Sequence, residues 1–317
     1  MSKSRSPHDV IHRMFPETKL NISNVEQRRD NQRRKVRLYA QGNQLGIVDR
    51  GMVHEKILAS HLGGVIIPYN IRRILECRNV IYLGPFSSKQ IWRLYKASMQ
   101  NNMLHIYLWW IGTDVYNAIN RHNRYNVKHI KRIKNVTHLC VSEELKRELM
   151  GIGIRAKVLT LVPDKIMNKL PLPEDYTVAV YMPSSHLSFY RYKQVKEIIM
   201  SLPDIKFIVY GNKNSLDISG LKNVECRGWV SNTKDIFRDS SALLRLTVHD
   251  GFPKSIIESV MYGRYVITNH EFPHIEVLKN NISIIKKLRE KPVLKPSVRE
   301  YYEKNYNIKN IKDAFPR

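Results

Sequence analysis

Short apolar segments alternate with amphipathic segments along most of the chain, and this alternation is the feature that most limits the possible folds. Five apolar segments of the first half are predicted strands: residues 36–40, 65–69, 79–84, 104–110 and 136–141. The pattern resumes at residues 177–183 and ends in a predicted helix at residues 274–280. Strands that alternate with helices form right-handed βαβ units and parallel sheets. The sequence therefore predicts an α/β protein.

A proline-rich segment divides the pattern into two halves. The prolines that interrupt it are Pro163, Pro171, Pro173 and Pro183. A chain of 317 residues is long enough for two cores. We predict four parts: a basic arm over residues 1–35, Rossmann-like domains over 36–163 and 164–295, and a C-terminal helix or tail over 296–317. Ligands of such sheets bind at the carboxyl ends of the strands.

The positive charge is concentrated in the first half. The net charge is +25, and residues 1–160 hold 28 Lys and Arg against 11 Asp and Glu. Residues 121–134 carry six Lys and Arg and no acid, with Ile130 and Ile133 as part of a thin apolar stripe. Such a segment fits a membrane surface or a phosphate backbone, and a solvated helix face is the plain alternative. An anionic partner is expected, with a lipid membrane favoured over nucleic acid.

Targeting and cysteine signals are weak. No apolar run approaches the length of about 20 residues that a membrane span needs, and residues 1–17 lack the apolar core of a secretory signal. Cys77, Cys140 and Cys226 are too far apart for a metal or disulfide motif. We expect a cytoplasmic protein, with peripheral attachment to the inner face of a membrane left open, and no metal site.

Residues 243–269 hold the most informative segment. An apolar strand ends near Val248, residues 249–253 read as a turn, and a helix is predicted to begin at Lys254. The free amides of Lys254, Ser255 and Ile256 would then bind an anion, which the helix dipole favours. Gly251 would permit a close backbone approach, and Pro253 suits a helix start. A diphosphate is the expected occupant.

Charged residues around this turn complete the prediction. Asp250 and Glu258 are separated by seven residues, and Glu258 can accept hydrogen bonds from two ribose hydroxyls. Arg245 lies inside an apolar strand, where a buried guanidinium requires an anionic partner. That partner can be a ligand phosphate or a carboxylate.

Residues 243–269 resemble the donor-site signature of GT-B glycosyltransferases, in particular the large retaining family 4. Asp250 and Glu258 stand at the two acidic positions of that signature, with Gly251, Phe252 and Pro253 between them. Residues 223–247 resemble the strand, turn and helix that precede it. The resemblance extends over about residues 175–275 and is weaker over 36–160. It implies two Rossmann-like domains whose parallel sheets face each other across a cleft.

The resemblance also implies residue roles. Trp229 would flank the nucleobase, although core packing explains it equally well, and Asp250 would contact the donor sugar. Glu258 would bind the ribose. The remaining predicted donor-site residues are His249, Gly251, Phe252, Pro253, Lys254 and Ser255. The family's phosphate-binding Arg and Lys have no clear match; Arg191 and Lys193 are candidates, and Arg245 is an alternative.

A second set of candidates lies at the carboxyl end of the fourth strand. Gly112, Thr113 and Asp114 follow the apolar run of residues 104–110. Asp114 either caps the following helix or acts as a catalytic base near the acceptor. Gly42 is predicted in a glycine loop after the first strand, where a substrate can approach.

These features predict a glycosyltransferase of the hexosyltransferase class that uses a UDP- or GDP-sugar donor without a cofactor. Retention of configuration is implied by the family resemblance. The alternatives are a basic nucleic-acid-binding protein on an α/β scaffold, a glycosyltransferase that acts on DNA, and a nucleotide-sugar epimerase of GT-B shape.

Overall fold

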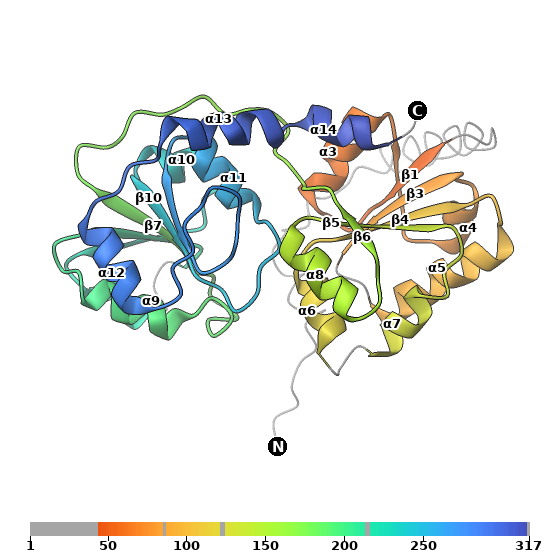
Figure 1. Cartoon of the computed structure of the whole chain (residues 1–317), viewed down its shortest axis with the longest axis horizontal. Coiled ribbons are helices and arrows are strands. Elements are labelled where there is room, and N and C mark those ends of the chain that lie inside the picture. The colour runs from red at the N-terminus through yellow and green to blue at the C-terminus, as the bar shows by residue number, and fades with distance from the viewer. Residues whose placement is uncertain (1–43, 85–86, 121–123, 213–215, 316–317) are drawn as a thin grey trace, which may run out of the picture. The chain divides into compact units, whose positions relative to one another are not determined.

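The protein contains two parallel sheets, each between layers of helices (Figure 1). The structure is a computed structural model that describes residues 44–84, 87–120, 124–212 and 216–315. The predicted arm, the predicted strand at 36–40 and Gly42 lie outside these residues. From Gln44 onward the residues form one compact unit by their contacts.

The N-terminal half holds a sheet of six parallel strands in the order β2-β1-β3-β4-β5-β6. Its strands are β1 (Leu45–Val48), β2 (Val65–Ile67), β3 (Asn79–Leu83), β4 (His105–Trp110), β5 (Val136–Cys140) and β6 (Ala156–Val158). The first of these was not predicted, because a four-residue strand that starts with Leu45 and Gly46 carries a weak signal. Leu108, Trp109 and Trp110 are buried, as expected for a central strand of a parallel sheet.

Helices cover both faces of this sheet. They are α3 (Val53–Leu62), α4 (Ile71–Leu75), α5 (Ser88–Gln100), α6 (Thr113–Ile119), α7 (Arg124–Ile130) and α8 (Glu143–Gly151). Predicted start signals are confirmed: the Ser87 side chain accepts the Gln90 amide, and Ser142 accepts that of Leu145. Helix α3 lies on one face, with α4, α5 and α7 on the other (Figure 1).

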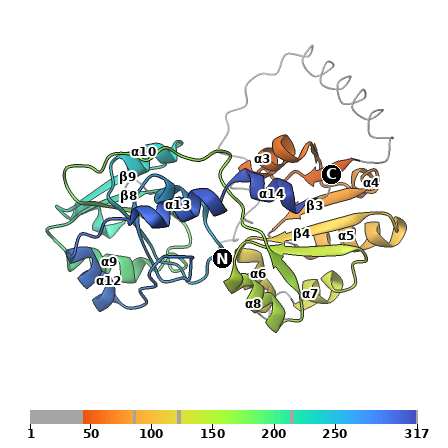
Figure 2. The same ribbon diagram turned by 45° about the horizontal axis from the view of Figure 1, so that its top comes forward.

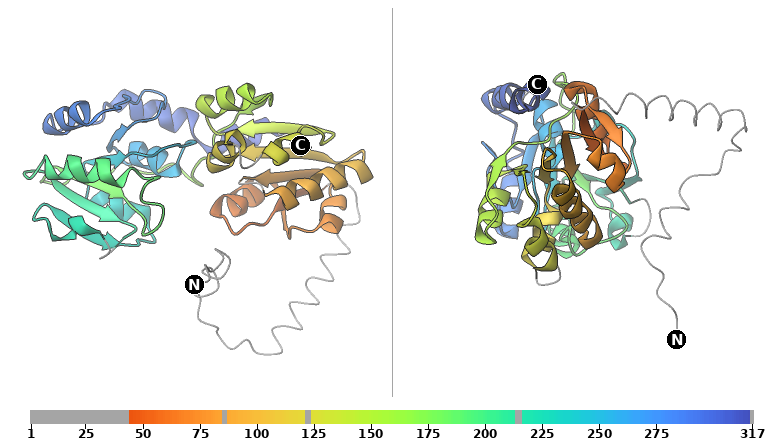
Figure 3. Two further views of the ribbon diagram at one scale, coloured as in Figure 1. Left: turned by 90° about the horizontal axis from the view of Figure 1, so that it is seen from below. Right: turned by 90° about the vertical axis from the view of Figure 1, so that its right-hand side faces the viewer.

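The C-terminal half holds a sheet of five parallel strands in the order β11-β10-β7-β8-β9. The strands are β7 (Thr177–Tyr181), β8 (Lys206–Tyr210), β9 (Val224–Gly228), β10 (Ala242–Arg245) and β11 (Tyr265–Thr268). Its helices are α9 (Tyr192–Met200), the 3₁₀ turn η2 (Asp217–Gly220), α10 (Thr233–Arg238), α11 (Lys254–Met261), α12 (Asn281–Arg289) and α13 (Pro296–Asn305). Two further views show helices on both faces of each sheet (Figure 3).

The helix predicted at residues 274–280 is wrong. This segment forms no helix: it begins with a turn at His274, and Val277 then forms an isolated parallel bridge with Thr268 at the end of β11. The amide of Leu278 donates to the Thr268 carbonyl at 2.9 Å. A short segment with alternating apolar residues does not distinguish a helix from an edge strand.

The C-terminal residues return to the N-terminal sheet. Helix α14 (Ile308–Ala314) lies beside α3 (Figures 1 and 2). The ring of Phe315 packs 4.9 Å from that of Tyr107 and 6.0 Å from that of Trp109, both on β4. The predicted terminal helix is therefore two helices, of which the second covers a face of the other half.

Candidate functional site

The turn after β10 leads into α11 as the sequence predicts. Helix α11 begins at Lys254, and Pro253 precedes it in an extended conformation with φ of −67°. The three amides expected to be free are not equivalent, because Ile256 donates to the Pro253 carbonyl at 3.0 Å. The prediction of a free Ile256 amide is wrong, because this amide is already hydrogen-bonded within the turn. Lys254 and Ser255 lie at the open side of the helix start, where they line a pocket.

This pocket, of about 270 Å³, lies at the carboxyl ends of the C-terminal sheet. Tyr181, Tyr210 and Arg245 are the last residues of β7, β8 and β10, and all three line it. The first turn of α11 and the start of α10 contribute Lys254, Ser255, Glu258 and Thr233. Every lining residue belongs to the C-terminal half. The location is the one that open parallel sheets use for ligands.

An ion pair between a buried acid and a partly exposed lysine lines the pocket. Glu258 is only 2% exposed, and its Oε1 lies 3.1 Å from Nζ of Lys254, one helical turn earlier. Burial raises the pKa of Glu258, while Lys254 and the Thr233 hydroxyl oppose that rise. An acid with hydrogen-bonding capacity and an ammonium group thus stand together at a helix N-terminus.

A second ion pair lies beside the first. Arg245 donates from Nε to Oδ2 of Asp250 at 2.8 Å, and both side chains are 13% exposed. Asp250 also accepts from the Thr247 hydroxyl and from the Gly251 amide. The buried arginine has therefore found a carboxylate, one of the two partners expected from the sequence. Because Arg245 lines the pocket, it connects Asp250 to the site that Glu258 occupies.

The rest of the lining is apolar and aromatic. Val180, Val230, Ile236, Phe237 and Leu243 form much of it. Trp229 is 78% exposed, which excludes core packing as the reason for this residue. A large exposed ring beside an apolar wall offers a stacking surface for a planar group.

Ser255 adds an unused polar group. Its Oγ is buried and has no hydrogen-bond partner within the described residues, although the residue lines the pocket. A buried hydroxyl without a partner is costly, and a bound ligand would relieve that cost.

Four residues that were predicted for the donor site do not contribute to the lining of this pocket. They are His249, Phe252, Arg191 and Lys193. Phe252 is buried and its ring stacks on Phe272 at 4.8 Å. Arg191 donates from Nε to the Thr247 carbonyl at 2.8 Å, and Lys193 is exposed on α9. None of the four lines the pocket.

Gly251 and His249 serve contacts between the two halves. A Cβ atom at Gly251 would lie 2.1 Å from the Ile111 carbonyl oxygen. The close approach that Gly251 permits is therefore to the protein's own backbone. His249 is 7% exposed, and its Nε2 lies 2.9 Å from Oε2 of Glu148 on α8. Burial lowers the pKa of His249, but the Glu148 carboxylate outweighs it, so the net shift is upward.

The predicted acceptor-side residues form a closed turn. Gly112 has φ of +138° and is followed by Thr113, the exposed first residue of α6. Asp114 is 4% exposed, and its carboxylate accepts the amides of Ile111 at 3.0 Å and Gly112 at 2.8 Å. Burial raises the pKa of Asp114 to about 6, although these amides oppose the shift. The geometry accounts for this carboxylate without any substrate.

His54, on α3 of the N-terminal half, interacts electrostatically with Lys254 and was missed by sequence reasoning. Burial and, to a smaller extent, the positive charge of Lys254 lower its pKa to about 4. The residue follows β1 closely, so recognition of that strand would have marked His54 as a candidate.

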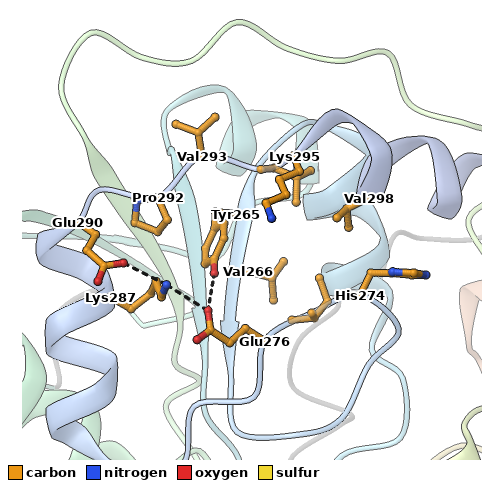
Figure 4. A pocket seen from close by; sticks show the side chains of 12 residues that line it. Tyr265, Val266, His274, Glu276, Lys287, Glu290, Pro292, Val293, Lys295 and Val298 are labelled. Atoms are coloured by element: carbon orange, nitrogen blue, oxygen red, sulfur yellow. Dashed lines mark hydrogen bonds and ion pairs between the residues drawn. The ribbon is translucent and has the colours of Figure 1, made fainter.

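A larger hollow, of about 430 Å³, lies near the start of β11 (Figure 4). Three of its charged groups pair with one another: Lys287 lies 3.2 Å from Glu276 and 3.0 Å from Glu290, and the Tyr265 hydroxyl donates to Glu276 at 3.1 Å. Tyr265 is the first residue of its strand, so this hollow is not at the carboxyl end of the sheet.

The described residues show neither a metal-binding cluster nor a membrane-spanning helix. No three His, Cys, Asp or Glu side chains among them are grouped so as to hold a metal ion. Among the same residues, no helix combines the length and apolar character that crossing a bilayer requires.

Solved structures share this fold. HepE (Alr3699) of Anabaena, solved in complex with UDP and glucose, matches with a TM-score of 0.61 and 9% identity over 86% of this chain and 98% of HepE. A glycosyltransferase of Rickettsia africae matches with a TM-score of 0.60 and 12% identity over 86% of this chain and 97% of that one. TarM matches with a TM-score of 0.59 and 13% identity over 76% of this chain. The match covers 54% of TarM, so this chain spans only about half of the length of TarM.

These matches establish the architecture. No family profile matches the sequence, and no curated protein sequence matches it. The protein has the α/β fold of GT-B glycosyltransferases, with two sheets of parallel strands, as the sequence predicted.

Proposed function

We propose that this protein is a glycosyltransferase that transfers a hexose from a UDP- or GDP-sugar, with retention of configuration, to an acceptor. The observation that carries the proposal is the pocket at the start of α11, where Glu258, Lys254 and Arg245 surround an apolar space edged by Trp229. Its parts match those of a sugar nucleotide: an apolar wall for the base, a carboxylate for the ribose, and a helix N-terminus with cations for the diphosphate. HepE, whose fold is similar, was solved with UDP and glucose.

The two ion pairs define how a donor would be accommodated. Lys254 and Arg245 are each neutralised by a carboxylate in the free protein. Ribose hydroxyls would donate to Glu258, and Lys254 would turn toward the diphosphate, joined by the Ser255 hydroxyl and the amides of the helix start. On donor binding, Glu258 would exchange Lys254 for the ribose hydroxyls, and Lys254 would exchange Glu258 for the diphosphate. The charge of the diphosphate is thereby compensated within the site.

The same groups would act during transfer. The bond between the anomeric carbon and the diphosphate oxygen breaks, a bond from that carbon to the acceptor oxygen forms, and the acceptor proton leaves with the nucleoside diphosphate or solvent. Negative charge grows on the leaving diphosphate, where the α11 amides and Lys254 stabilise it. Asp250, held by its ion pair with Arg245, is proposed to contact the donor sugar.

The experiment measures donor binding and turnover across UDP- and GDP-sugars by calorimetry and product analysis. Glu258→Ala should weaken donor binding by about tenfold to a hundredfold, because hydrogen bonds to a charged group contribute about 1.5–3 kcal/mol. Glu258→Ala should stay folded without a ligand. The Lys254 side chain, which loses its carboxylate partner, is 34% exposed and can be solvated by water.

Asp239→Ala provides the matched control. It removes a carboxylate that pairs with Arg227 in the same half but does not line the pocket. Its donor affinity should equal that of the wild type. Full activity of Glu258→Ala, or failure of the wild type to bind any sugar nucleotide, would refute the assignment.

A further inference from the structure

One stretch of the N-terminal half is almost free of acidic residues. Between Ser87 and Lys134 the single acid is Asp114, and it is buried with 4% exposure. The same stretch supplies seven cations whose side chains are described: Lys89, Arg93, Lys96, Lys128, Lys131, Arg132 and Lys134. Within the described part of the chain, none of them forms an ion pair with a carboxylate. The surface they form therefore keeps its full positive charge.

Helix α5 presents apolar groups on its outer side. Trp92 is 41% exposed and Met99 is 49% exposed, while Ile91 and Leu94 on the opposite side are fully buried. The ammonium group of Lys96 lies 3.9 Å from the centre of the Trp92 ring. Met103, just after the helix, is 69% exposed. Residues 92, 96 and 99 follow the spacing of one helical face.

Helix α7 and the turn after it extend this surface. The ring of Tyr95 on α5 lies 5.9 Å from that of His129 on α7. Figure 1 shows the two helices on the same face of the sheet. Lys128, Lys131, Arg132 and Lys134 are exposed. Ile130 and Ile133, predicted as part of a thin apolar stripe, are 1% and 5% exposed, so they face the interior of the protein.

We infer that this α5–α7 surface (Trp92, Met99, Met103 and the seven cations) docks onto a bilayer that contains anionic lipids. Lys and Arg side chains would meet the headgroups, and the indole and thioether groups would enter the interface. A nucleic acid would use the cations but gain little from exposed methionines. A second copy of the chain would bring the same charge and be repelled.

The outer helices of the C-terminal half show the contrast. On α9 and around α12, basic residues alternate with acids such as Glu197 and Glu290, and Lys287 is paired with Glu276 and Glu290. Met200 and Ile282 are exposed there, at 57% and 82%. An ordinary solvated surface of this protein thus mixes charge signs, unlike the α5–α7 surface.

The test is co-sedimentation of the full chain with phosphatidylcholine vesicles, with or without phosphatidylglycerol. Lys128→Ser/Lys131→Ser/Lys134→Ser should weaken binding to the anionic vesicles roughly a hundredfold, because each Lys near an anionic membrane strengthens binding by roughly fivefold. Trp92→Ser/Met103→Ser should weaken it roughly tenfold or more. High salt should reduce the effect of the cations.

Matched controls come from the other half. Lys222→Ser/Lys279→Ser/Lys286→Ser and Met200→Ser/Ile282→Ser alter equally exposed residues and should bind vesicles like the wild type. The inference is overturned if test and control variants bind alike. It is also overturned if the Trp92/Met103 variant is unaffected while the Lys128/Lys131/Lys134 variant loses binding to a DNA duplex. Donor binding need not change in any of these variants, so this result is independent of the proposed activity.

Discussion

The carboxyl ends of the two sheets differ: one is closed by a filled turn and the other borders a pocket. In the N-terminal half, the turn after β4 is filled: Asp114 accepts two backbone amides, and a Cβ atom at Gly84 would lie 1.9 Å from its carboxylate. In the C-terminal half, the turn after β10 borders a pocket in which Glu258, Lys254 and Ser255 are accessible to a ligand. Both turns contain a Gly and an Asp and lead into a helix: Asp250 precedes Gly251 directly, whereas Thr113 separates Gly112 from Asp114.

The difference shows what sheet topology decides and what it leaves to side chains. Topology brings polar residues to the carboxyl edge in both halves. Whether a hollow remains there depends on where the carboxylates find donors. Asp114 finds them in its own turn, so the space closes. Glu258 stands one helical turn inside α11 and finds a lysine that can leave it.

The largest effect is expected on the closed turn. Asp114→Ala should lower the free energy of unfolding by about 2–4 kcal/mol, because two buried amides lose their acceptor. Urea unfolding measures this loss, and calorimetry of the folded variant should show unchanged donor affinity. Asp114→Asn, which keeps one acceptor oxygen, should recover part of the stability. If Asp114→Ala were stable but inactive, the turn would be a catalytic element and the comparison would fail.

The contact between the two turns should tolerate little change. Gly251→Ala should cost about 1–3 kcal/mol, since the new methyl group would overlap the Ile111 carbonyl. Thermal unfolding provides the measurement. Gly220→Ala is the control, because nothing lies within 4 Å of its Cβ position. Equal stability of the two variants would show that the turns are not in contact.

The open site should respond in binding more than in stability. Lys254→Met should weaken binding of the nucleoside diphosphate about tenfold while leaving that of the nucleoside nearly unchanged, because the ammonium group is proposed to meet only the phosphates. Calorimetry with UDP and uridine, or GDP and guanosine, separates the two. Equal losses for both ligands would place Lys254 away from the diphosphate.

The smallest effect concerns the histidines, whose pKa shifts differ in sign between the halves. Burial lowers the pKa of His138 to about 4, and its Nδ1 accepts the Trp110 indole at 3.2 Å. The unfolded chain therefore binds more protons between about pH 4 and 6.5, and His138 makes stability fall as pH falls through this window. His138→Gln should flatten that part of the stability curve.

His249 gives the opposite sign. Its pKa is raised against Glu148, so its contribution is fully present below about pH 6.5 and is lost as pH rises through the folded-state pKa. His249→Gln should therefore reduce stability more at pH 6 than at pH 8, as denaturant titrations at several pH values would show. Parallel curves for the two variants would remove this difference between the halves.

The sequence predicted most of the elements but not all of their edges. Buried strands such as β4 and β5 were found because central strands of parallel sheets are continuously apolar. Strand β1 was missed, and with it His54, because four residues with little alternation give almost no periodic signal. The helix expected at residues 274–280 is an edge segment, whose pairing depends on a neighbouring strand that local sequence does not reveal.

The candidate site was predicted in part. Trp229, Arg245, Lys254, Ser255 and Glu258 line one pocket, as expected for residues at one edge of a sheet. Arg191, Lys193 and Phe252 do not line it, because their positions depend on which way each turn directs its side chains. The sequence also could not show that Ile130 and Ile133 face inward and that Trp92, Met99 and Met103 face outward.

The sequence by itself determined the alternation of strands and helices, the helix start at Lys254 and the acid-free basic stretch, because these follow from local propensity and composition. Only the tertiary structure decided which carboxylates are hydrogen-bonded within the protein, which cations have no carboxylate partner and which turn borders an open pocket. Those outcomes depend on partners that lie far apart in the chain, such as Gly251 with Ile111 and His249 with Glu148, and no local pattern encodes their distances.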